Sequence, residues 1–570
     1  MLERKRLLLS SGIIIILCLL GIILVAFINP ASPIARQAAS VINPAPNVIP
    51  SLREWRGATG EFELPSNNAH IVINSPDATR LQETAKAFQE DLRAVNKHTL
   101  PIITATSANA GDFFLTLHSN DIAIGNQGYQ LSIGDSVTIS AITSQGAFYG
   151  TRSILQILVQ DDAHSHLPRG WVRDYPSYAL RGFMLDVGRK FVPLNQLKDY
   201  VKLLAWYKLN DFHLHLNDNQ FEVGTGKDWK EKYSAFRLKS EHFEGLEAQD
   251  GAYSKQDMRQ LQDLARAYSV TITPEIDAPA HALAFTKYRP DLASTKYDKD
   301  FLDLNNPKTY TFMDSIWDEF LPWFDAPELH IGVDEYAVSD ADNYRRYINH
   351  YISYLKQHGK KARIWGSLSE MKSSVAVNTD ATLEVWNNSW SNPIEMKKMG
   401  FRIINANDKM LYIVPQSTYY QDHLNTQMLY EKWEPYIFDL NNPQLNFKPD
   451  DPQLEGAIFA EWNDQLSAGV TEAGLHERIK PAAQVLSEKM WGSTANRLAY
   501  EQFKPLTDII DDAPGTNLPN SWRLVNPPSL QVPPHTIEAT QLASIDIATR
   551  DKEANLPALS RNQASTYNVL

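Results

Sequence analysis

Two neighbouring carboxylates, Asp334 and Glu335, are the residues of this sequence best placed to do acid–base chemistry. They follow the apolar segment 328–333 and precede Tyr336, so they stand where a buried strand is expected to end. Repulsion between them and partial burial would raise the pKa of Glu335 and help keep it protonated near neutral pH. An Asp-Glu pair taken alone usually lies in a solvated loop, but this position favours a functional pair.

The pair cannot serve as acid and nucleophile across one glycosidic bond in the usual retaining geometry, which needs about 5–5.5 Å between the carboxyl groups. Side chains alternate along a strand, so the two diverge unless the backbone bends. They can divide the work if the substrate carries its own nucleophile, as a 2-acetamido sugar does. Glu335 would then protonate the departing oxygen. Asp334 would hold the acetamido N–H while the acetamido carbonyl attacks the anomeric carbon to give an oxazoline-type intermediate.

The elements that must position this pair alternate strand and helix between residues 176 and 498. Eight short segments are interpreted as strands: 181–187, 211–216, 270–276, 328–333, 362–365, 382–386, 402–405 and 456–462. Amphipathic helices lie between several of them, for example the one that places Tyr344, Ile348 and Leu355 on one face. This rhythm predicts an α/β fold, a closed (β/α)8 TIM barrel, as the catalytic domain.

Such a barrel carries its active site at the carboxyl ends of the strands, and polar and aromatic residues gather at the predicted ends. These residues are Asp218, Gln220, Asp277, His281, Trp365, Trp386, Tyr412, Trp462 and Asp464. We expect them to line a sugar-binding cleft. The tryptophans could instead pack the barrel. His213 and His215 are expected to be hydrogen-bonded core residues rather than metal ligands, because further histidine ligands are missing from the motif.

The flanking regions predict supporting roles. Residues 55–175 mix short strands with two helices and predict a small α+β domain without a cluster of reactive side chains. Residues 29–54 are rich in Pro, Ala and Ser, and we interpret them as a flexible linker with no fold of its own. Residues 499–570 indicate a C-terminal extension that packs at first and then fades into a flexible tail.

The N-terminal residues 1–28 contain an apolar run, 7–27, preceded by basic residues. A run of this length just crosses a hydrocarbon core of roughly 30 Å, and the basic flank belongs on the cytoplasmic side. We predict an uncleaved signal anchor, a transmembrane helix that leaves the rest of the chain extracytoplasmic. The alternatives are a cleaved signal peptide, which would make the protein secreted, and a lipoprotein site at Cys18.

Charge and cysteine content exclude some classes of protein. The net charge of −13 argues against nucleic acid as a partner and restricts membrane contact to the N-terminal segment. Cys18 is the single cysteine, so an internal disulfide is not possible.

Four ordered segments resemble the motifs of family 20 β-N-acetylhexosaminidases: RGFMLDVGRK at 181–190, HLHLND at 213–218, PEIDAPAH at 274–281 and HIGVDE at 330–335. Each motif is modest, but four on the expected strands are specific together, and the resemblance extends over residues 55–495. It implies an exo-acting glycoside hydrolase that releases terminal β-linked N-acetylhexosamine, GlcNAc or GalNAc, from oligosaccharides or glycoconjugates. It also implies chemistry that needs no metal and no organic cofactor.

The resemblance implies roles for the residues of the catalytic centre. Glu335 matches the general acid/base of the family, and Asp334 matches the carboxylate that orients the acetamido group. Asp277 and His281 resemble a relay hydrogen-bonded toward the acid, which would set its protonation.

The resemblance also implies how the sugar is held. Arg181 matches the residue that binds the hydroxyls of the terminal sugar, and Asp464 matches a carboxylate on its outer hydroxyls. Asp218 and Gln220 are expected to contact substrate as well. The acetamido pocket is expected to have aromatic walls and a hydroxyl donor, which are Trp365, Trp386, Trp462 and Tyr412.

Some positions depart from the family pattern. Asp464 stands where many members have Glu, Val333 and Ala280 stand where Gly is common, and Asn219 replaces the second Asp of a usual pair. This pattern is closer to the lacto-N-biosidase branch, and a shorter carboxylate at 464 could leave room for an added sugar. Release of a disaccharide is therefore an alternative. A non-catalytic sugar-binding surface protein and a metal-dependent amidohydrolase are the other two readings.

Overall fold

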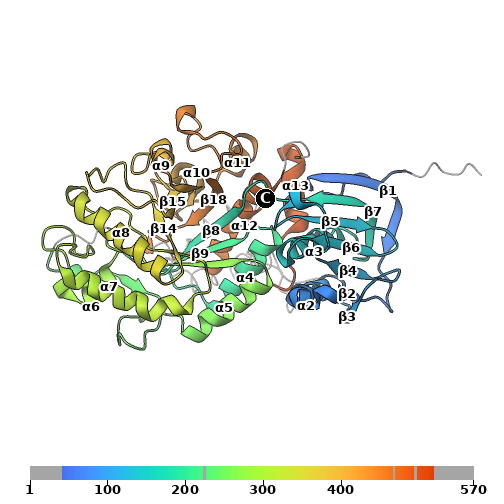
Figure 1. Ribbon diagram of the computed structural model, residues 1–570, viewed down its shortest axis with the longest axis horizontal. Helices are drawn as coiled ribbons and strands as arrows, with labels where there is room; N and C mark the ends of the chain where they lie inside the picture. The colour runs from blue at the N-terminus through green and yellow to red at the C-terminus, as the bar shows by residue number, and fades with distance from the viewer. Residues whose placement is uncertain (1–40, 222–225, 467–468, 493–496, 519–570) are drawn as a thin grey trace, which may run out of the picture.

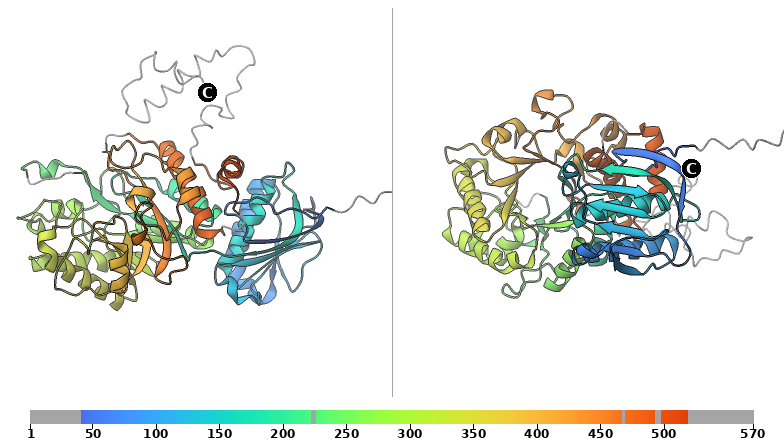
Figure 2. Two further views of the ribbon diagram at one scale, coloured as in Figure 1. Left: turned by 90° about the horizontal axis from the view of Figure 1, so that it is seen from above. Right: turned by 45° about the vertical axis from the view of Figure 1, so that its right-hand side comes forward.

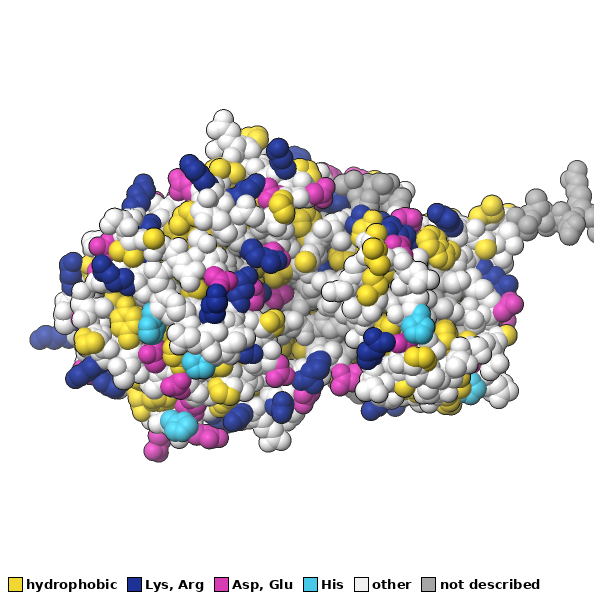
Figure 3. Space-filling model, in the orientation of Figure 1, with side chains coloured by type: hydrophobic (Ala, Val, Ile, Leu, Met, Phe, Trp, Pro, Cys, Tyr) yellow, Lys and Arg dark blue, Asp and Glu magenta, His cyan; other side chains and the backbone are white. Residues whose placement is uncertain are grey.

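The computed structural model describes residues 41–221, 226–466, 469–492 and 497–518. These residues form an N-terminal α+β domain and a larger barrel domain, which lie side by side (Figures 1 and 2). Acidic and basic side chains are interspersed over the face of both domains seen in Figure 3, so charge of one sign is not concentrated on the described part of that face.

The N-terminal domain is one mixed sheet with two helices on the side of the barrel (Figure 2). Both helices are amphipathic, and the apolar side chains of α3 (Ser144–Leu158) are buried, with Thr143 capping its first turn. The other helix is α2 (Ala78–Asn96). The strands in sheet order are β1 (Glu54–Glu63), β7 (His166–Asp174), β5 (Tyr129–Ile133), β6 (Val137–Ala141), β4 (Phe113–Thr116), β2 (Ile71–Asn74) and β3 (Ile102–Ala105). The predicted α+β domain is confirmed.

The second domain is a closed barrel of eight parallel strands. The strands are β8 (Leu180–Asp186), β9 (Asp211–His215), β12 (Thr271–Glu275), β13 (Glu328–His330), β14 (Lys361–Trp365), β15 (Ala381–Val385), β16 (Arg402–Asn405) and β18 (Leu454–Glu461). Each pairs in parallel with the next, and β18 pairs with both β16 and β8, which closes the cylinder. All eight predicted strands are confirmed, although β13 is three residues shorter than the predicted 328–333.

Helices surround the barrel on the outside (Figure 1). They are α4 (Leu194–Trp206), α5 (Lys255–Ala267), α6 (Leu283–Tyr288), α7 (Pro307–Phe320), α8 (Ala341–Gln357), α9 (Pro393–Met399), α10 (Asp408–Leu411), α11 (Thr426–Lys432) and α12 (Glu472–Trp491). The predicted apolar stripe of α8 is buried against the barrel. Three short strands belong to the loops at the site: β10 (Asn217–Asn219), β11 (Ser234–Phe236) and β17 (Tyr412–Ile413).

The segments at both ends of the two domains differ from the predictions. Residues 41–53 are not a free linker, because Val48, Ile49 and Leu52 are buried in the core. The Ile49 amide donates to Gln156 Oε1 over 2.7 Å, and its carbonyl accepts from Gln156 Nε2 over 2.7 Å. The predicted linker at 29–54 is therefore wrong over its second half, where apolar side chains outweigh the Pro-rich composition. The predicted extension begins with a packed helix, α13 (Tyr500–Ile510).

Two predicted segments lie outside the described residues: the signal anchor at 1–28 and the tail from residue 519 onward. Within the part of the chain that the structure describes, no helix combines the length and the apolar character needed to cross a membrane. The anchor stays a prediction.

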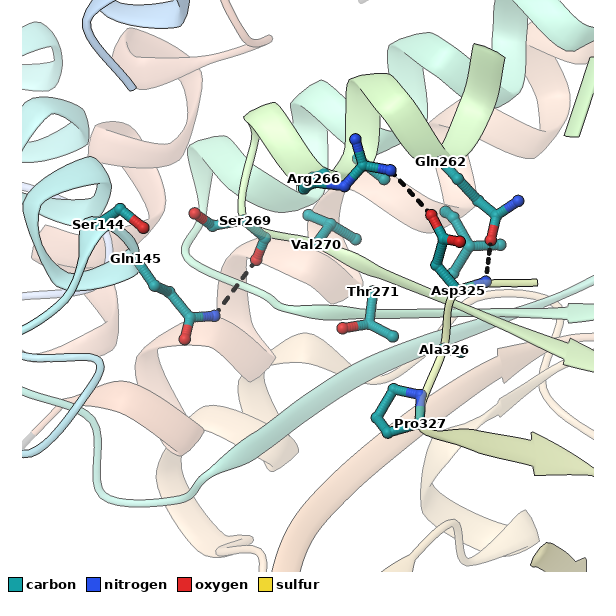
Figure 4. A pocket seen from close by; sticks show the side chains of 12 residues that line it. Ser144, Gln145, Gln262, Arg266, Ser269, Val270, Thr271, Asp325, Ala326 and Pro327 are labelled. Carbon is teal, nitrogen blue, oxygen red and sulfur yellow. Dashed lines mark hydrogen bonds and ion pairs between the residues drawn. The ribbon is translucent and has the colours of Figure 1, made fainter. Parts of the chain in front are cut away.

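The two domains meet at a pocket of about 280 Å³ at the amino ends of the barrel strands (Figure 4). Several of its polar groups interact with one another. Arg266 lies 2.8 Å from Asp325, Gln262 Oε1 accepts from the Asp325 amide over 2.7 Å, and Gln145 donates to the Ser269 carbonyl over 3.5 Å. We interpret this end of the barrel as a structural junction, which leaves the opposite end for the site.

Candidate active site

A pocket of about 170 Å³ opens at the carboxyl ends of the barrel strands. Its lining residues come from loops that follow several different strands, as the barrel predicts. They are Arg189, Asp218, Phe221, His281, Asp334, Glu335, Trp386, Tyr412, Tyr419, Tyr420, Trp462 and Asp464. Eight of these residues were predicted from the sequence. Four predicted residues lie elsewhere: Arg181, Gln220, Asp277 and Trp365.

A sharp backbone bend after β13 directs both catalytic candidates into this pocket. Gly332, Val333 and Glu335 have φ values of 69°, 71° and 46°, in the left-handed region. A non-glycine residue there costs about 1–3 kcal/mol, and such strain is typical of functional sites. A Cβ on Gly332 would lie 1.6 Å from Asp277 Oδ1, so only glycine fits. The bend ends β13 early and overcomes the alternation that would otherwise separate Asp334 from Glu335.

The imidazole of His281 contacts both carboxylates. Its Nε2 lies 3.4 Å from Glu335 Oε2 and 3.7 Å from Asp334 Oδ2. Its Nδ1 lies 3.1 Å from Asp218 Oδ1. One ring therefore connects the pair to a third, fully buried carboxylate.

The predicted relay is wrong in one residue. The carboxylate that contacts His281 Nδ1 is Asp218, and not Asp277 as predicted. Asp277 Oδ1 accepts from the Val333 amide over 3.1 Å, so this side chain supports the strained bend. The sequence proximity of Asp277 to His281 suggested a pair, but the loop between them turns His281 toward the end of β9. His281 lies next to Glu335, the predicted acid.

The pKa of Glu335 was expected to be raised, but in the structure it is lowered. Burial is the main cause that raises the pKa of Asp334 to about 6, and the neighbouring Glu335 adds to it. Burial also acts to raise the pKa of Glu335, but the hydrogen bond and charge of His281 outweigh it and hold that pKa below its ordinary value. Burial opposes the charge of His281, yet Asp218 and Asp334 raise the pKa of its imidazole well above the usual range. These two shifts favour a protonated His281 beside an ionised Glu335.

A buried chain of acids and imidazoles continues below this relay. His215 Nε2 lies 2.7 Å from Asp218 Oδ2, and its Nδ1 lies 2.6 Å from Glu275 Oε2. Glu275 also lies 3.0 Å from His213 Nε2 and 3.0 Å from His330 Nδ1. His215 is therefore a hydrogen-bonded core residue, as predicted. His213 is also buried in the core beside Glu275, but neither of its ring nitrogens makes a hydrogen bond to a described residue.

Three groups of these carboxylates and imidazoles lie close enough to hold a metal ion: His213, Glu275 and His330; His215, Glu275 and Asp277; and Asp277, His281 and Asp334. The first group lies deep in the barrel, where its members already face one another at contact distance.

Trp365 lies beneath the pocket and, contrary to the prediction, is not one of its lining residues. Its indole Nε1 donates to Glu275 Oε1 over 2.6 Å, and its side chain is almost completely buried. It packs against Trp462, whose ring lies 5.8 Å away. The position at the last residue of β14 turns the ring into the barrel, below the loops that form the pocket.

Arg181 is at the wrong end of the barrel to bind sugar, which corrects that prediction. It lies near the start of β8, is fully buried, and donates to the carbonyls of Lys208 (2.8 Å) and Tyr178 (2.7 Å). The arginine of the pocket is Arg189, eight residues later in the same motif and beyond the end of β8. The position relative to the strand end could have identified it from the sequence.

The guanidinium of Arg189 contacts three carboxylates at one side of the pocket. Its guanidinium lies 2.8 Å from Asp218 Oδ2, 3.0 Å from Asp186 Oδ2 and 3.4 Å from Asp464 Oδ1. Burial alone would lower the pKa of Arg189, but these carboxylates raise it instead. Arg189 is therefore charged, and its guanidinium is held in place by these carboxylates.

Aromatic rings make up the remaining wall and rim. Trp386, Tyr412 and Trp462 line the pocket as predicted, and the rings of Tyr412 and Trp462 lie 5.7 Å apart. Gln220 is not part of it, because its amide oxygen accepts from the Tyr233 amide over 3.1 Å. This bond joins the loop strands β10 and β11 and directs the side chain away.

Sequence reasoning missed three aromatic residues of the rim, Phe221, Tyr419 and Tyr420. The hydroxyl of Tyr419 donates to Asp464 Oδ2 over 2.9 Å, and its ring stacks on Phe221 at 6.2 Å. These residues lie in long loops without periodicity. Adjacent tyrosines in a polar loop are the one signal that could have indicated them.

Comparison with known proteins agrees with this geometry. The model of the glycosyl hydrolase family 20 catalytic domain matches residues 178–345 and 337–494, and the model of domain 2 of that family matches residues 45–175. The β-N-acetylhexosaminidase of Streptomyces coelicolor superposes with a TM-score of 0.67 at 20% identity, covering 84% of this chain and 98% of that one. At this identity the likeness shows the fold alone.

Two relatives illustrate the range of the similarity. A lacto-N-biosidase of Bifidobacterium bifidum is 25% identical over 498 residues, which is 82% of this chain and 41% of the relative. A beta-hexosaminidase of Porphyromonas gingivalis is 27% identical over 312 residues, 51% of this chain and 39% of the relative. The chain thus spans less than half the length of either. Because the two family models together match most of its residues, the protein belongs to glycosyl hydrolase family 20.

Proposed function

We propose that the protein is an exo-acting glycosidase that releases terminal β-linked N-acetylhexosamine, GlcNAc or GalNAc, from oligosaccharides or glycoconjugates. The catalysis is substrate-assisted and retaining, through an oxazoline intermediate. One observation carries the proposal: Asp334 and Glu335 line the same pocket, and His281 contacts both. Glu335 protonates the leaving oxygen, and Asp334 holds the acetamido N–H and offsets its developing charge.

The arrangement of acids favours a nucleophile supplied by the substrate. Apart from Asp334 and Glu335, the carboxylates that line the pocket among the described residues are Asp218 and Asp464. Both are within 3.4 Å of Arg189, and Asp218 also faces two imidazoles. Carboxylates engaged in this way are poor nucleophiles, because the bound cations stabilise their charge. The acetamido oxygen is then the group available to attack the anomeric carbon.

The proton of the leaving group is supplied by the His281–Glu335 pair. In the free protein the proton resides on His281, and a sugar that covers the half-exposed Glu335 removes water from its carboxylate. Desolvation disfavours the charged carboxylate and moves the proton onto Glu335, where it can be donated. Asp218 keeps the imidazole oriented throughout.

The size and lining of the pocket favour a single sugar. A volume of about 170 Å³ lies below the roughly 300–1,000 Å³ of pockets for drug-sized ligands. Arg189 and Asp464 would bind the outer hydroxyls of the ring. Trp386, Tyr412 and Trp462 would enclose the acetamido group.

A panel of chromogenic β-glycosides tests the proposal. We expect hydrolysis of the N-acetylglucosaminide or the N-acetylgalactosaminide and negligible hydrolysis of the glucoside, which lacks the acetamido group. Equal rates on the glucoside would refute the mechanism. Binding of the sugars without turnover would favour the non-catalytic sugar-binding protein, and loss of turnover after chelation would favour a metal-dependent hydrolase.

Release of a disaccharide is the second candidate, favoured by the lacto-N-biosidase relative that aligns with 82% of this chain. Asp464 is a short carboxylate, which would leave space next to the outer hydroxyls. A chromogenic lacto-N-bioside distinguishes the two, because an enzyme of this type cleaves it faster than the monosaccharide glycosides.

We further propose that the enzyme works outside the cytoplasm, attached to the cell membrane by residues 1–28. The apolar run at 7–27 and its basic flank support this placement. Fractionation of cells that express the whole chain should find it in the membrane, facing outward. Recovery from the medium would instead indicate a cleaved signal.

A further inference from the structure

His215 lies between two carboxylates in the core of the barrel. Its Nε2 is 2.7 Å from Asp218 Oδ2, and its Nδ1 is 2.6 Å from Glu275 Oε2. All three side chains are buried. An ionised carboxylate only accepts hydrogen bonds, so two bonds of this length place a proton on each nitrogen of the ring. The geometry therefore favours an imidazolium at His215.

The charges of the three groups support one another. Burial acts to raise the pKa of Asp218, but Arg189 and the imidazoles of His281 and His215 outweigh it and hold that pKa below its ordinary value. Burial opposes the charge of His215, yet Glu275 and Asp218 raise the pKa of its imidazole well above the usual range.

Asp218 divides its two oxygens among four donors. Oδ2 lies 2.8 Å from the guanidinium of Arg189 and 2.7 Å from His215. Oδ1 accepts from the Asn219 amide over 2.7 Å and lies 3.1 Å from Nδ1 of His281. A carboxylate offers about four lone-pair sites, so Asp218 is fully engaged. The contact to His281 is the longest of the four.

The sharing of Asp218 affects the proton on His281. A carboxylate whose charge is stabilised by other cations attracts a further proton less strongly. Among the described residues, the cations that contact Asp218 are Arg189, His215 and His281. Removal of His215 would therefore leave more of the negative charge of Asp218 to act on His281.

Glu275 fixes His215 in this position from within the barrel. Its Oε1 accepts from the indole Nε1 of Trp365 over 2.6 Å, and it lies 3.0 Å from both His213 and His330. These partners come from three different strands, β14, β9 and β13. The position of His215 is thus set by the barrel and not by the loops that line the pocket.

Other ionisable groups also face the two imidazoles. Asp277 lies within 4.8 Å of His215 and Glu275, and Glu384 acts on Glu275 from β15. Asp334 and Glu335 lie 3.7 Å and 3.4 Å from His281, and Asp300 acts on it through its charge. All of these groups are acids, so none of them can replace His215 as a cation on Asp218.

We propose that His215 is a positioning residue for the reaction: as a cation held by Glu275, it engages Asp218 and so limits how tightly His281 keeps the proton that passes to Glu335. The inference rests on the proposed function, in which Glu335 protonates the leaving oxygen. The proton moves from Nε2 of His281 to Oε2 of Glu335, and then to the glycosidic oxygen as that oxygen leaves with the bonding electron pair. His215 keeps both of its protons throughout.

The test compares His215→Gln with His213→Gln in the whole chain. Both imidazoles are buried on β9 beside Glu275, but only that of His215 contacts Asp218. In His215→Gln, Asp218 loses a cationic partner and holds the proton of His281 more tightly. The alkaline limb of the pH profile of kcat/KM should therefore move up by about half a unit or more. His213→Gln is the matched control, and its limb should stay in place.

The leaving group gives a second measure of the same effect. A proton that His281 holds more tightly is donated less readily, so His215→Gln should lower kcat about tenfold on a disaccharide with a terminal N-acetylglucosaminide. On the 4-nitrophenyl glycoside, whose leaving group needs little protonation, the loss should be smaller. Loss of packing alone would lower kcat on both substrates equally and leave the limb in place.

A limb that stays in place in His215→Gln, or moves to lower pH, would overturn the inference. If that variant does not fold, NMR of the wild type with ¹⁵N-labelled histidine replaces it, with the His215 ring assigned by its contact with Trp462. Both ring nitrogens should be protonated at neutral pH, and one unprotonated nitrogen would equally overturn the inference. Failure of the proposed function would show separately, as absence of hydrolysis of either substrate by the wild type.

Discussion

The Nε2 of His281 lies 3.4 Å from Glu335 Oε2, and the opposite ring nitrogen lies 3.1 Å from Asp218. Through this one ring, a buried carboxylate acts on the acid that must donate a proton. His281 lowers the pKa of Glu335, the proposed acid, and so favours its ionised form. Under the proposed function, proton donation therefore depends on substrate binding, which would shift the proton from His281 to Glu335.

Replacement of the acid itself should separate activity from folding. Glu335→Gln keeps the shape of the side chain but has no proton to donate, so kcat should fall about 10²–10⁴-fold on substrates with poor leaving groups. The side chain is 42% exposed, and the melting temperature should change little. Steady-state kinetics on a natural-type disaccharide, together with thermal unfolding, measure both. A variant with wild-type kcat would rule out Glu335 as the acid.

Replacement of Asp218, which contacts His281, should shift the alkaline limb of the pH profile of kcat/KM. Asp218 raises the pKa of His281, so Asp218→Asn should let the shared proton dissociate at lower pH and move that limb of kcat/KM down by about one unit or more. Asp277→Asn is the matched comparison, since Asp277 bonds to the Val333 amide instead. Its alkaline limb should stay in place, and a shift of equal size in both variants would contradict the corrected relay.

The pKa of Asp334 should set the acidic limb of the pH profile of kcat/KM. Ionisation of Asp334 should also lower the free energy of unfolding. It must be ionised to hold the acetamido N–H, so kcat/KM should rise as pH increases through about 6. The pKa in the folded state is raised above the ordinary aspartate value of 3.8, so the folded protein binds this proton more tightly than the unfolded chain. Its contribution to stability is present below pH 4 and is lost as pH rises through 6.

Asp334→Asn should remove the loss of stability that ionisation of Asp334 causes above pH 6. At pH 7.5 we expect the variant to gain up to about 3 kcal/mol of unfolding free energy while losing nearly all activity. Urea unfolding at pH 4.5 and 7.5 measures the change. A variant that is less stable than the wild type at both pH values would contradict the assignment of Asp334 as an anion that burial makes unfavourable.

Replacement of Arg189 should affect mainly KM, whereas replacement of Arg181, in the same sequence motif, should affect mainly the free energy of unfolding. Arg189→Met removes a cation from the pocket, so KM should rise at least about tenfold, as expected for loss of charge-assisted hydrogen bonds. Arg181→Met leaves buried carbonyls without donors, so the free energy of unfolding should fall by about 2–4 kcal/mol with KM near the wild-type value. Kinetics and urea unfolding of both variants decide. The reverse pattern would restore Arg181 to the sugar site.

The sequence predicts the barrel well because all eight strands leave a strong apolar signal, and closure follows from their number. It predicts that Asp334 and Glu335 belong to the pocket because they follow an apolar, strand-like segment, although β13 itself ends at His330. Sequence proximity misled in the case of Asp277, since contact with His281 depends on the path of the loop. The role of Trp365 depends on which way the last residue of a strand turns.

Other residues of the site carried too little local signal. Tyr419 and Phe221 meet across the rim from two separate loops, and their contact is set by the tertiary fold. The directions in which the pKa values of His281 and Glu335 shift also depend on burial and on neighbouring charges, which the order of residues does not contain.

The most direct test of the central claim is a series of 4-nitrophenyl N-acylglucosaminides in which the acetyl group carries zero, one, two or three fluorine atoms. Fluorine withdraws electrons from the amide oxygen, which is the proposed nucleophile. We predict that kcat/KM falls steeply and regularly along the series. A flat series, with the trifluoroacetyl substrate cleaved as fast as the acetyl one, would show that the amide does not attack the anomeric carbon.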